Sequence, residues 1–171
     1  MKTLRVGLVL FLVMTLGPPL LVFADTWKEP VKDSKRFTVL SSFNNQAVLD
    51  NETGLVWEQS PSTSPEGFTW LDAQSHCLRL TVGNRRGWRL PTVQELSSLV
   101  DPSSGTFCPN LPSGHPFNTA LCVGWTATTS AQFDISAWKV FFEPGLDASF
   151  DLKINALPVW CVRGGQGVDP Q

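Results

Sequence analysis

The side chains in this sequence that could do chemistry are first of all its four cysteines, Cys77, Cys108, Cys122 and Cys161. Their spacing matches neither a zinc site nor a redox-active CxxC pair. In an exported chain an even number of cysteines indicates disulfides, and four cysteines allow three pairings. We therefore predict a disulfide framework.

Catalysis by the two histidines is the alternative. His76 lies next to Cys77, but a cysteine held in a disulfide is not a nucleophile. His115 lies in Ser-Gly-His-Pro, which is typical of a loop. The sequence has no Ser-His-Asp grouping and no glycine-rich phosphate loop. We predict no catalytic residue, no metal ligand and no cofactor, and we expect the protein not to be an enzyme.

The chain begins with a pattern typical of a secretory signal peptide. Lys2 and Arg5 precede an apolar run over 6–23, and Val22 and Ala24 occupy the small-residue positions of a cleavage site. The Gly-Pro-Pro break at 17–19 favours this interpretation over a transmembrane anchor. We predict a signal peptide over 1–24, a polar linker over 25–35, and export to a periplasm or the outside of the cell, with no stable membrane insertion after cleavage.

The net charge argues against nucleic acid as a partner. Cleavage would leave 13 − 2 = 11 Lys and Arg against 15 Asp and Glu, a formal charge of −4. Nucleic-acid binding depends on basic side chains that neutralise phosphates. Arg79, Arg85, Arg86 and Arg89 crowd one segment, so a local basic patch stays open.

The elements that must position these side chains follow from hydrophobic periodicity and capping signals. Short apolar runs predict strands over 36–40, 46–50, 55–59, 121–130, 136–143 and 156–164, with a turn region over 143–151. Thr69 with Asp72, and Thr92 with Glu95, have the spacing of capping boxes and predict two helices between the groups of strands.

We predict one α+β domain over 36–165, whose C-terminal strand returns to the core, and a flexible tail over 166–171. The segment 87–101, GWRLPTVQELSSLVD, is interpreted as scaffolding that leads into the second helix and buries its apolar face. The predicted core residues are Trp57, Trp70, Trp88, Leu90, Leu96, Trp125 and Trp160.

Six segments occur in a characteristic order: VLDNETGLVWEQ, FTWLDAQSHCLRL, GWRLPTVQELSSLVD, GWTATTS, AWKVFF and VWCVRGG. Together, over about residues 36–165, they resemble the family of the C-terminal domain of the Legionella collagen-like protein. The resemblance implies a C-type-lectin-like fold: a mixed sheet with two helices and long loops, held together by disulfides and closed by a final strand. It also implies the pairing Cys77–Cys161, which leaves Cys108 to pair with Cys122.

A calcium-dependent sugar site is the first function to test against this fold. Lectins of this fold use Glu-Pro-Asn or Gln-Pro-Asp and a later Trp-Asn-Asp. Here Glu143-Pro144-Gly145 lacks the third side-chain oxygen, and Trp-Asn-Asp is missing. Calcium needs about six to eight oxygen ligands, so we predict no calcium site and interpret Asp147 and Asp151 as solvated turn residues.

Binding through the loops over 103–118 and 127–137 is the remaining interpretation, unless these loops merely cover the core. The candidate residues are Phe107, His115, Phe117, Gln132, Phe133 and Asp134. We predict a recognition or adhesion module for a glycan, a matrix component or an envelope protein. The alternatives are a structural subunit of the cell envelope that contacts only protein and, last, a formylglycine-generating-like modifying enzyme.

Overall fold

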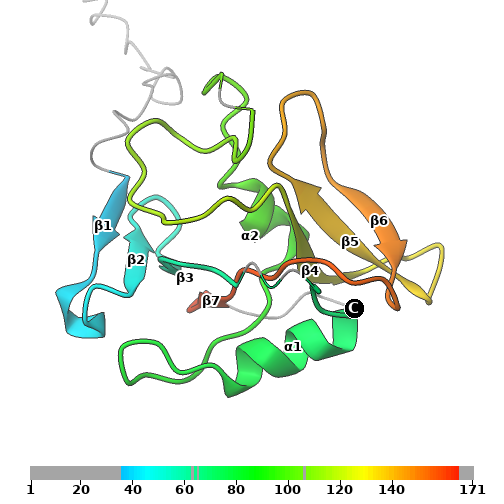
Figure 1. The fold of residues 1–171 in the computed structure, drawn as a ribbon, viewed down its shortest axis with the longest axis horizontal. Helices are drawn as coiled ribbons and strands as arrows, with labels where there is room; N and C mark the ends of the chain where they lie inside the picture. Colours follow the sequence, from blue (N-terminus) through cyan, green and yellow to red (C-terminus); the bar gives the residue numbers. More distant parts are fainter. Residues whose placement is uncertain (1–35, 63, 65, 106, 166–171) are drawn as a thin grey trace, which may run out of the picture. The chain divides into compact units, whose positions relative to one another are not determined.

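The structure, a computed structural model, describes residues 36–62, 64, 66–105 and 107–165 (Figure 1). The predicted signal peptide over 1–24, the linker over 25–35 and the tail over 166–171 lie outside these residues. Within the described ranges, no helix is long and apolar enough to cross a membrane.

Two antiparallel sheets form the framework of the described residues. The first contains, in spatial order, β1 (Phe37–Val39), β2 (Ala47–Asp50), β3 (Val56–Glu58) and β7 (Val162–Arg163). The second contains β4 (Val123–Thr129), β5 (Ser136–Phe141) and β6 (Ser149–Leu152). The predicted α+β class is confirmed, but the predicted single mixed sheet is not, because every pairing of these strands is antiparallel.

The predicted strand over 156–164 is much shorter than expected. Before β7, the chain makes only isolated bridges, from Leu157 to Phe68 and from Val159 to Ser62. Pro158 between them has no N–H to donate to a ladder. This segment therefore runs between several parts of the fold, and it joins a sheet only at its end.

Strand β6 overlaps residues 143–151, where the sequence predicts a turn region. It forms because it pairs with β5, where Trp138 lies opposite Phe150 as a cross-strand aromatic pair. The interpretation of Asp151 as a solvated turn residue is wrong, because its Oδ2 accepts a hydrogen bond from Lys139 Nζ at 2.6 Å.

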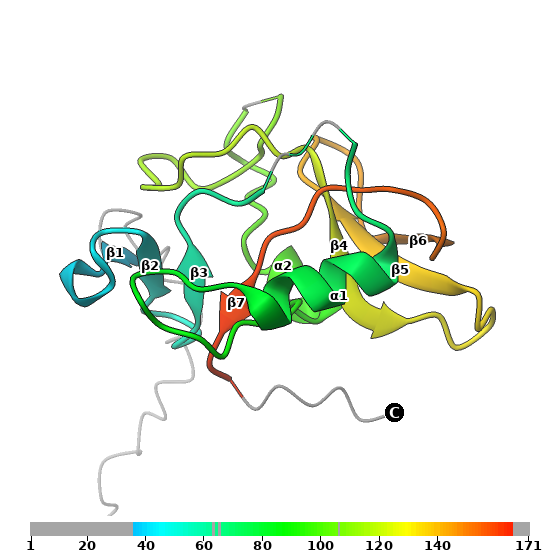
Figure 2. The ribbon, with the colours of Figure 1, turned by 60° about the horizontal axis from the view of Figure 1, so that its bottom comes forward.

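Both helices begin at the predicted capping residues. Helix α1 (Trp70–Arg79) begins where the Thr69 hydroxyl accepts the N–H of Asp72 at 3.3 Å. Helix α2 (Val93–Ser97) has a complete capping box between Thr92 and Glu95. Figure 2 shows α1 lying alongside β4.

The first sheet is buried on both faces. Successive side chains of a strand point to opposite faces, and the neighbours Ala47 and Val48 are both fully buried in different hydrophobic clusters. The predicted core residues Trp57, Leu96 and Trp160 belong to one cluster, and Trp88, Leu90 and Trp125 belong to the other.

Trp70 is the exception among the predicted core residues. It is only partly buried, because it lies at the first position of α1. Its indole Nε1 donates to the carbonyl of Thr126 at 2.8 Å, and Lys153 Nζ lies 4.6 Å from its ring centre. The indole thus covers the edge of the core rather than filling it.

The four cysteines form two disulfides, Cys77–Cys161 and Cys108–Cys122. The first joins α1 to the residue before β7, and the second joins the long loop to the residue before β4. This is the pairing that the family resemblance implies, and it leaves no free cysteine.

Candidate functional site

Three predicted binding residues, Gln132, Phe133 and Asp134, lie exposed in the turn between β4 and β5. The Ser130 hydroxyl accepts the N–H groups of Gln132 and Phe133 at 3.3 and 3.2 Å. Because Ser130 is itself buried, these bonds hold the turn against the framework. The three side chains are therefore presented together from a defined backbone.

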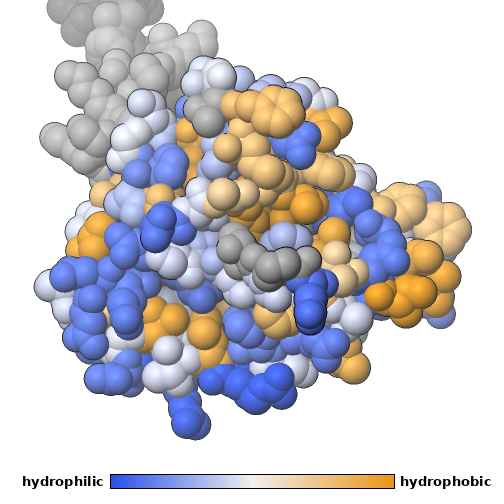
Figure 3. All heavy atoms as spheres, viewed as in Figure 1, coloured by the Kyte–Doolittle hydropathy of each residue, from blue (hydrophilic) through white to orange (hydrophobic). Residues whose placement is uncertain are grey.

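Phe133 is part of a larger apolar surface on the β5–β6 hairpin. The ring centres of Phe133 and Phe150 are 5.5 Å apart, and those of Trp138 and Phe150 are 5.9 Å apart. Ile135 and Ile154 are 63% and 79% exposed at the same end of the hairpin, where Lys153 N donates to the carbonyl of Ile135. The β5–β6 apolar face, as we call it, consists of Phe133, Ile135, Trp138, Phe150, Leu152 and Ile154. Hydrophobic side chains gather at this end of the hairpin in Figure 3, on the right of the view.

Charged groups on the opposite face of the hairpin join its two strands. Lys139 pairs with Asp151 across β5 and β6, and Lys153 Nζ donates to the carbonyl of Asp134 at 2.5 Å. Burial alone would raise the pKa of Asp151, but the hydrogen bond from Lys139 and those from Leu152 N and Asn155 outweigh it and hold the pKa below its usual value. Asp151 therefore stays ionised on the face of the hairpin opposite to Phe150 and Leu152.

The other predicted loop divides into an exposed and a buried part. Phe107 is 75% exposed, whereas Phe117 is only 6% exposed and packs edge-on against Trp160 and Phe37. The prediction of Phe117 as a ligand-binding residue is therefore wrong; it anchors the loop to the core. His115 stacks on Phe117, and burial lowers its pKa.

The structure does not gather all the predicted residues into one site. Gln132, Phe133 and Asp134 share one turn, whereas Phe107 and His115 belong to the long loop. No hydrogen bond or ring contact between described residues links the two groups. The β4–β5 turn with the β5–β6 apolar face presents more large exposed apolar side chains than the long loop, where Phe107 is the one among the described residues.

A pocket of about 240 Å³, which no sequence pattern predicted, lies at the end of β3. It is lined by Gln46, Glu58, Gln59, Ser60, Thr81 and Val82. Its walls are fixed, because the N–H of Gly83 donates to Gln46 Oε1 at 2.9 Å and Gln59 Nε2 donates to the carbonyl of Pro116 at 3.2 Å. Gly83 has a positive φ of 55°, and a Cβ there would meet the backbone of Phe43 at 2.4 Å, so glycine is required.

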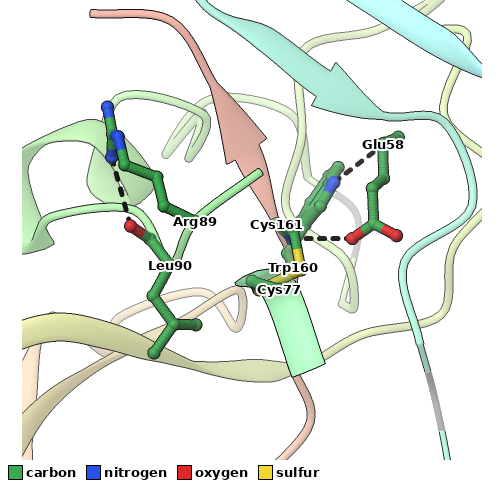
Figure 4. The surroundings of a disulfide bond; sticks show 6 residues. All are labelled: Glu58, Cys77, Arg89, Leu90, Trp160 and Cys161. Atoms are coloured by element: carbon green, nitrogen blue, oxygen red, sulfur yellow. Dashed lines mark hydrogen bonds between the residues drawn. A yellow bond between two sulfur atoms is a disulfide. The ribbon is translucent and has the colours of Figure 1, made fainter. Parts of the chain in front are cut away.

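Glu58 is the charged group of this pocket. Its Oε2 accepts the N–H of Cys161 at 2.7 Å, next to the Cys77–Cys161 disulfide, and its carbonyl accepts the indole N–H of Trp160 at 2.9 Å (Figure 4). The residue is 5% exposed, and burial raises its pKa to about 7, against the lowering effect of the Cys161 N–H. A glutamate in a strand that is buried on both faces is the signal that could have identified it.

One family model matches this chain, that of the Lcl C-terminal domain, over residues 46–163. The chain belongs to this family. Among curated proteins, no sequence matches the chain. The match confirms the family that the six ordered segments indicate.

In this Lcl C-terminal domain, the segment 87–101 contains α2, and its first residues bond to the last strand, β7. The backbone of Arg89 exchanges two hydrogen bonds with Val162 at 2.9 Å. Its guanidinium binds both oxygens of Glu95 at 2.7 and 2.8 Å and the carbonyl of Gly164 at 2.7 Å. Burial alone would raise the pKa of Glu95, but the bonds from Arg89 and Thr92 hold it below its usual value.

The described part of this family member contains no group of three His, Cys, Asp or Glu side chains placed to hold a metal ion. His76 packs its ring 4.7 Å from that of Phe68, and its Nε2 is buried without a hydrogen-bond partner. Burial, together with the charge of Arg79, lowers its pKa. The partly buried ring of this histidine therefore packs against Phe68, and its surroundings disfavour the charged form.

Proposed function

We propose that this Lcl C-terminal domain is an exported, non-enzymatic recognition module whose β5–β6 apolar face binds an extracellular or cell-envelope protein. The observation that carries the proposal is the exposure of that face, where aromatic and aliphatic side chains stand together on a hydrogen-bonded hairpin. Contiguous exposed apolar surface bordered by polar groups is typical of protein-binding sites.

A glycan is the second candidate partner, and a different feature favours it. Aromatic rings whose polar neighbours can donate and accept hydrogen bonds suit the apolar faces and hydroxyl groups of sugars. Phe133 lies between Gln132 and Asp134 in just this way. The aliphatic residues Ile135 and Ile154, which are more exposed than Phe133, favour the protein partner.

Export and the C-type-lectin-like fold are part of the proposal. Disulfides persist in oxidising compartments, and all four cysteines are paired. The disulfide from α1 to the residue before the last strand supports the proposed fold, as does the loop-rich α+β architecture. Fold alone does not identify a ligand, so the binding proposal depends on the apolar face.

We also propose that the protein is not an enzyme, because its four cysteines are held in disulfides. Both disulfides remove the thiolates that a modifying enzyme would use. A purely structural role in the envelope would use the same apolar face, but its partner would be a permanent one.

The test is a binding screen of the purified, oxidised chain against matrix proteins, envelope proteins and glycans, with and without a chelator. We expect a protein partner, and we expect Phe133→Ser and Phe150→Ser each to weaken binding about tenfold, or ~1.4 kcal/mol. Chelator should have no effect.

Leu78→Ser is the matched control, because this leucine is 68% exposed near the C-terminal end of α1, whereas the N-terminal end of the helix contacts Lys153. Binding that Leu78→Ser weakens and the hairpin variants do not would overturn the proposed site. A glycan that depends on Phe133 would keep the site and replace the partner class. A complex that never dissociates would favour the structural subunit.

A further inference from the structure

The first sheet contains two buried carboxylates, and only one of them has a cationic partner. Asp50 is fully buried, and Arg36 contacts both its oxygens at 3.2 and 3.0 Å. Glu58 is almost as buried, yet none of the ion pairs between described residues includes it. Buried carboxylates are almost always paired, because an isolated charge is costly away from water.

The free part of Glu58 faces the pocket. Cys161 N–H occupies Oε2, whereas Oε1 has no hydrogen-bond donor among the described residues and is not enclosed by them. Ser60 and Thr81 also line the pocket, and neither hydroxyl hydrogen-bonds to a described residue. The described lining therefore combines one carboxylate with residues that carry neutral oxygens, and it includes no cationic side chain.

We propose that this pocket binds a small primary ammonium ligand, whose –NH₃⁺ group supplies the counter-charge that Glu58 lacks. An ammonium has three donors and acts as a point charge, so it needs one carboxylate oxygen and further neutral acceptors. A guanidinium prefers to grip both oxygens of a carboxylate, and Oε2 is already engaged by Cys161.

Other ligand classes fit the lining less well. Sugar sites offer an aromatic ring for stacking, and the described lining residues include no aromatic side chain. A divalent cation needs more than one anionic ligand, and Glu58 is the only charged residue among the described lining residues. The volume of about 240 Å³ lies below the roughly 300–1,000 Å³ of sites for drug-sized molecules, so the ligand is small.

Binding is linked to the proton on Glu58. A bound ammonium stabilises the carboxylate, so it lowers the pKa of Glu58 and releases a proton near neutral pH. Charged or titratable side chains of the elements packed around the pocket lie outside its lining: Asp50, Asp72, His76, Arg79, Arg85 and Arg163. The proton that is released therefore comes from Glu58.

The test is a carbon-13 NMR titration of the carboxyl groups of the oxidised chain, with propylammonium as the probe. We expect a saturable change at Glu58 and a fall of its apparent pKa by about one unit, which corresponds to a tenfold preference of the probe for the ionised form. Propanol, the neutral molecule of the same shape, should change neither. Because the readout uses the unmodified protein, it does not depend on the folding of a variant.

Glu58→Gln should abolish saturable propylammonium binding, and Glu66→Gln, at an exposed glutamate, should preserve it. Equal responses to propylammonium and propanol would overturn the assignment of an ammonium site. A saturable response that survives in Glu58→Gln would overturn it as well, because the probe would then bind elsewhere. Neither result bears on the β5–β6 apolar face, because its residues do not line this pocket.

Discussion

At the scale of single residues, Glu58 and Asp50 show how the same chemical group behaves in two surroundings of one sheet. Arg36 supplies Asp50 with a charge partner, so this carboxylate is buried together with its counter-ion. Glu58 has one backbone N–H and a pocket instead. Desolvation therefore dominates at Glu58, and its neutral form is favoured up to about pH 7.

Stability should fall between pH 4.5 and about 7 because of this one group. In that range the native Glu58 keeps a proton that the unfolded chain has released, so its stabilising contribution is complete below pH 4.5 and is lost as the pH rises through 7. At about 1.4 kcal/mol per pKa unit, the loss approaches ~3 kcal/mol. Glu58→Gln keeps an acceptor for Cys161 N and should remove this loss.

Urea unfolding at pH 5 and pH 8 measures the effect as the difference between the original chain and Glu58→Gln. The two histidines act in the opposite direction, because burial lowers their pKa values, but they cancel in that difference. Glu66→Gln serves as the control. Parallel stability curves for the original chain and Glu58→Gln would contradict the prediction.

At the scale of elements, α2 is stabilised by what surrounds it. A helix of five residues is too short to be stable by itself, so α2 depends on its packing and its caps for stability. Arg89 connects it to β7, the N–H of Val93 donates to the Thr128 hydroxyl at 3.0 Å, and Leu96 is fully buried. The segment before α2 is held by Trp88, whose indole N–H donates to the carbonyl of Arg85 and whose ring packs edge-on against Phe43.

Trp88→Ala should destabilise the domain by about 3–5 kcal/mol, because it leaves a large cavity in the cluster under α1. Chemical denaturation monitored by circular dichroism would show the loss. Arg86→Ala, at an exposed position of the same segment, should change the stability by less than about 0.5 kcal/mol. A Trp88→Ala protein of normal stability that no longer bound its partner would mean that this segment is a site and not scaffolding.

At the scale of the whole molecule, the last strand ties distant parts together. β7 pairs with β3 and with Arg89, and the residue before it is bonded to α1 through a disulfide. That disulfide spans 84 residues, whereas Cys108–Cys122 spans 14. A crosslink that closes a longer loop restricts the unfolded chain more.

Removal of Cys77–Cys161 by paired alanine substitutions should cost about 4–5 kcal/mol, and removal of Cys108–Cys122 about 3 kcal/mol, on the chain-entropy model. Unfolding in urea without reductant would measure both costs. Removal of Cys77–Cys161 should always cost more than removal of Cys108–Cys122, because the first pair is also fully buried in the core. An equal or reversed order would show that native contacts, and not loop length, decide the contribution of each disulfide.

Local patterns in the sequence determined the helices and most strands. The capping residues Thr69 and Thr92 set the start of each helix through bonds that reach only three residues along the chain. The alternation around Trp57 placed a strand because side-chain direction repeats every two residues. The disulfide pairing came from the family resemblance, since four cysteines by themselves leave three pairings open.

The tertiary structure decided which side chains are buried and which groups meet. Phe107 and Phe117 have similar loop surroundings in the sequence, yet only Phe117 finds Trp160 and Phe37 beside it. β6 exists because β5 offers it an edge, and Trp70 stays partly exposed because it begins its helix. The role of Glu58 in the pocket could not be predicted from the sequence, because it also depends on tertiary contacts. Its burial and its pocket arise from β7, α1 and the turn at Gly83, segments far apart in the chain, and no local pattern records contacts of that range.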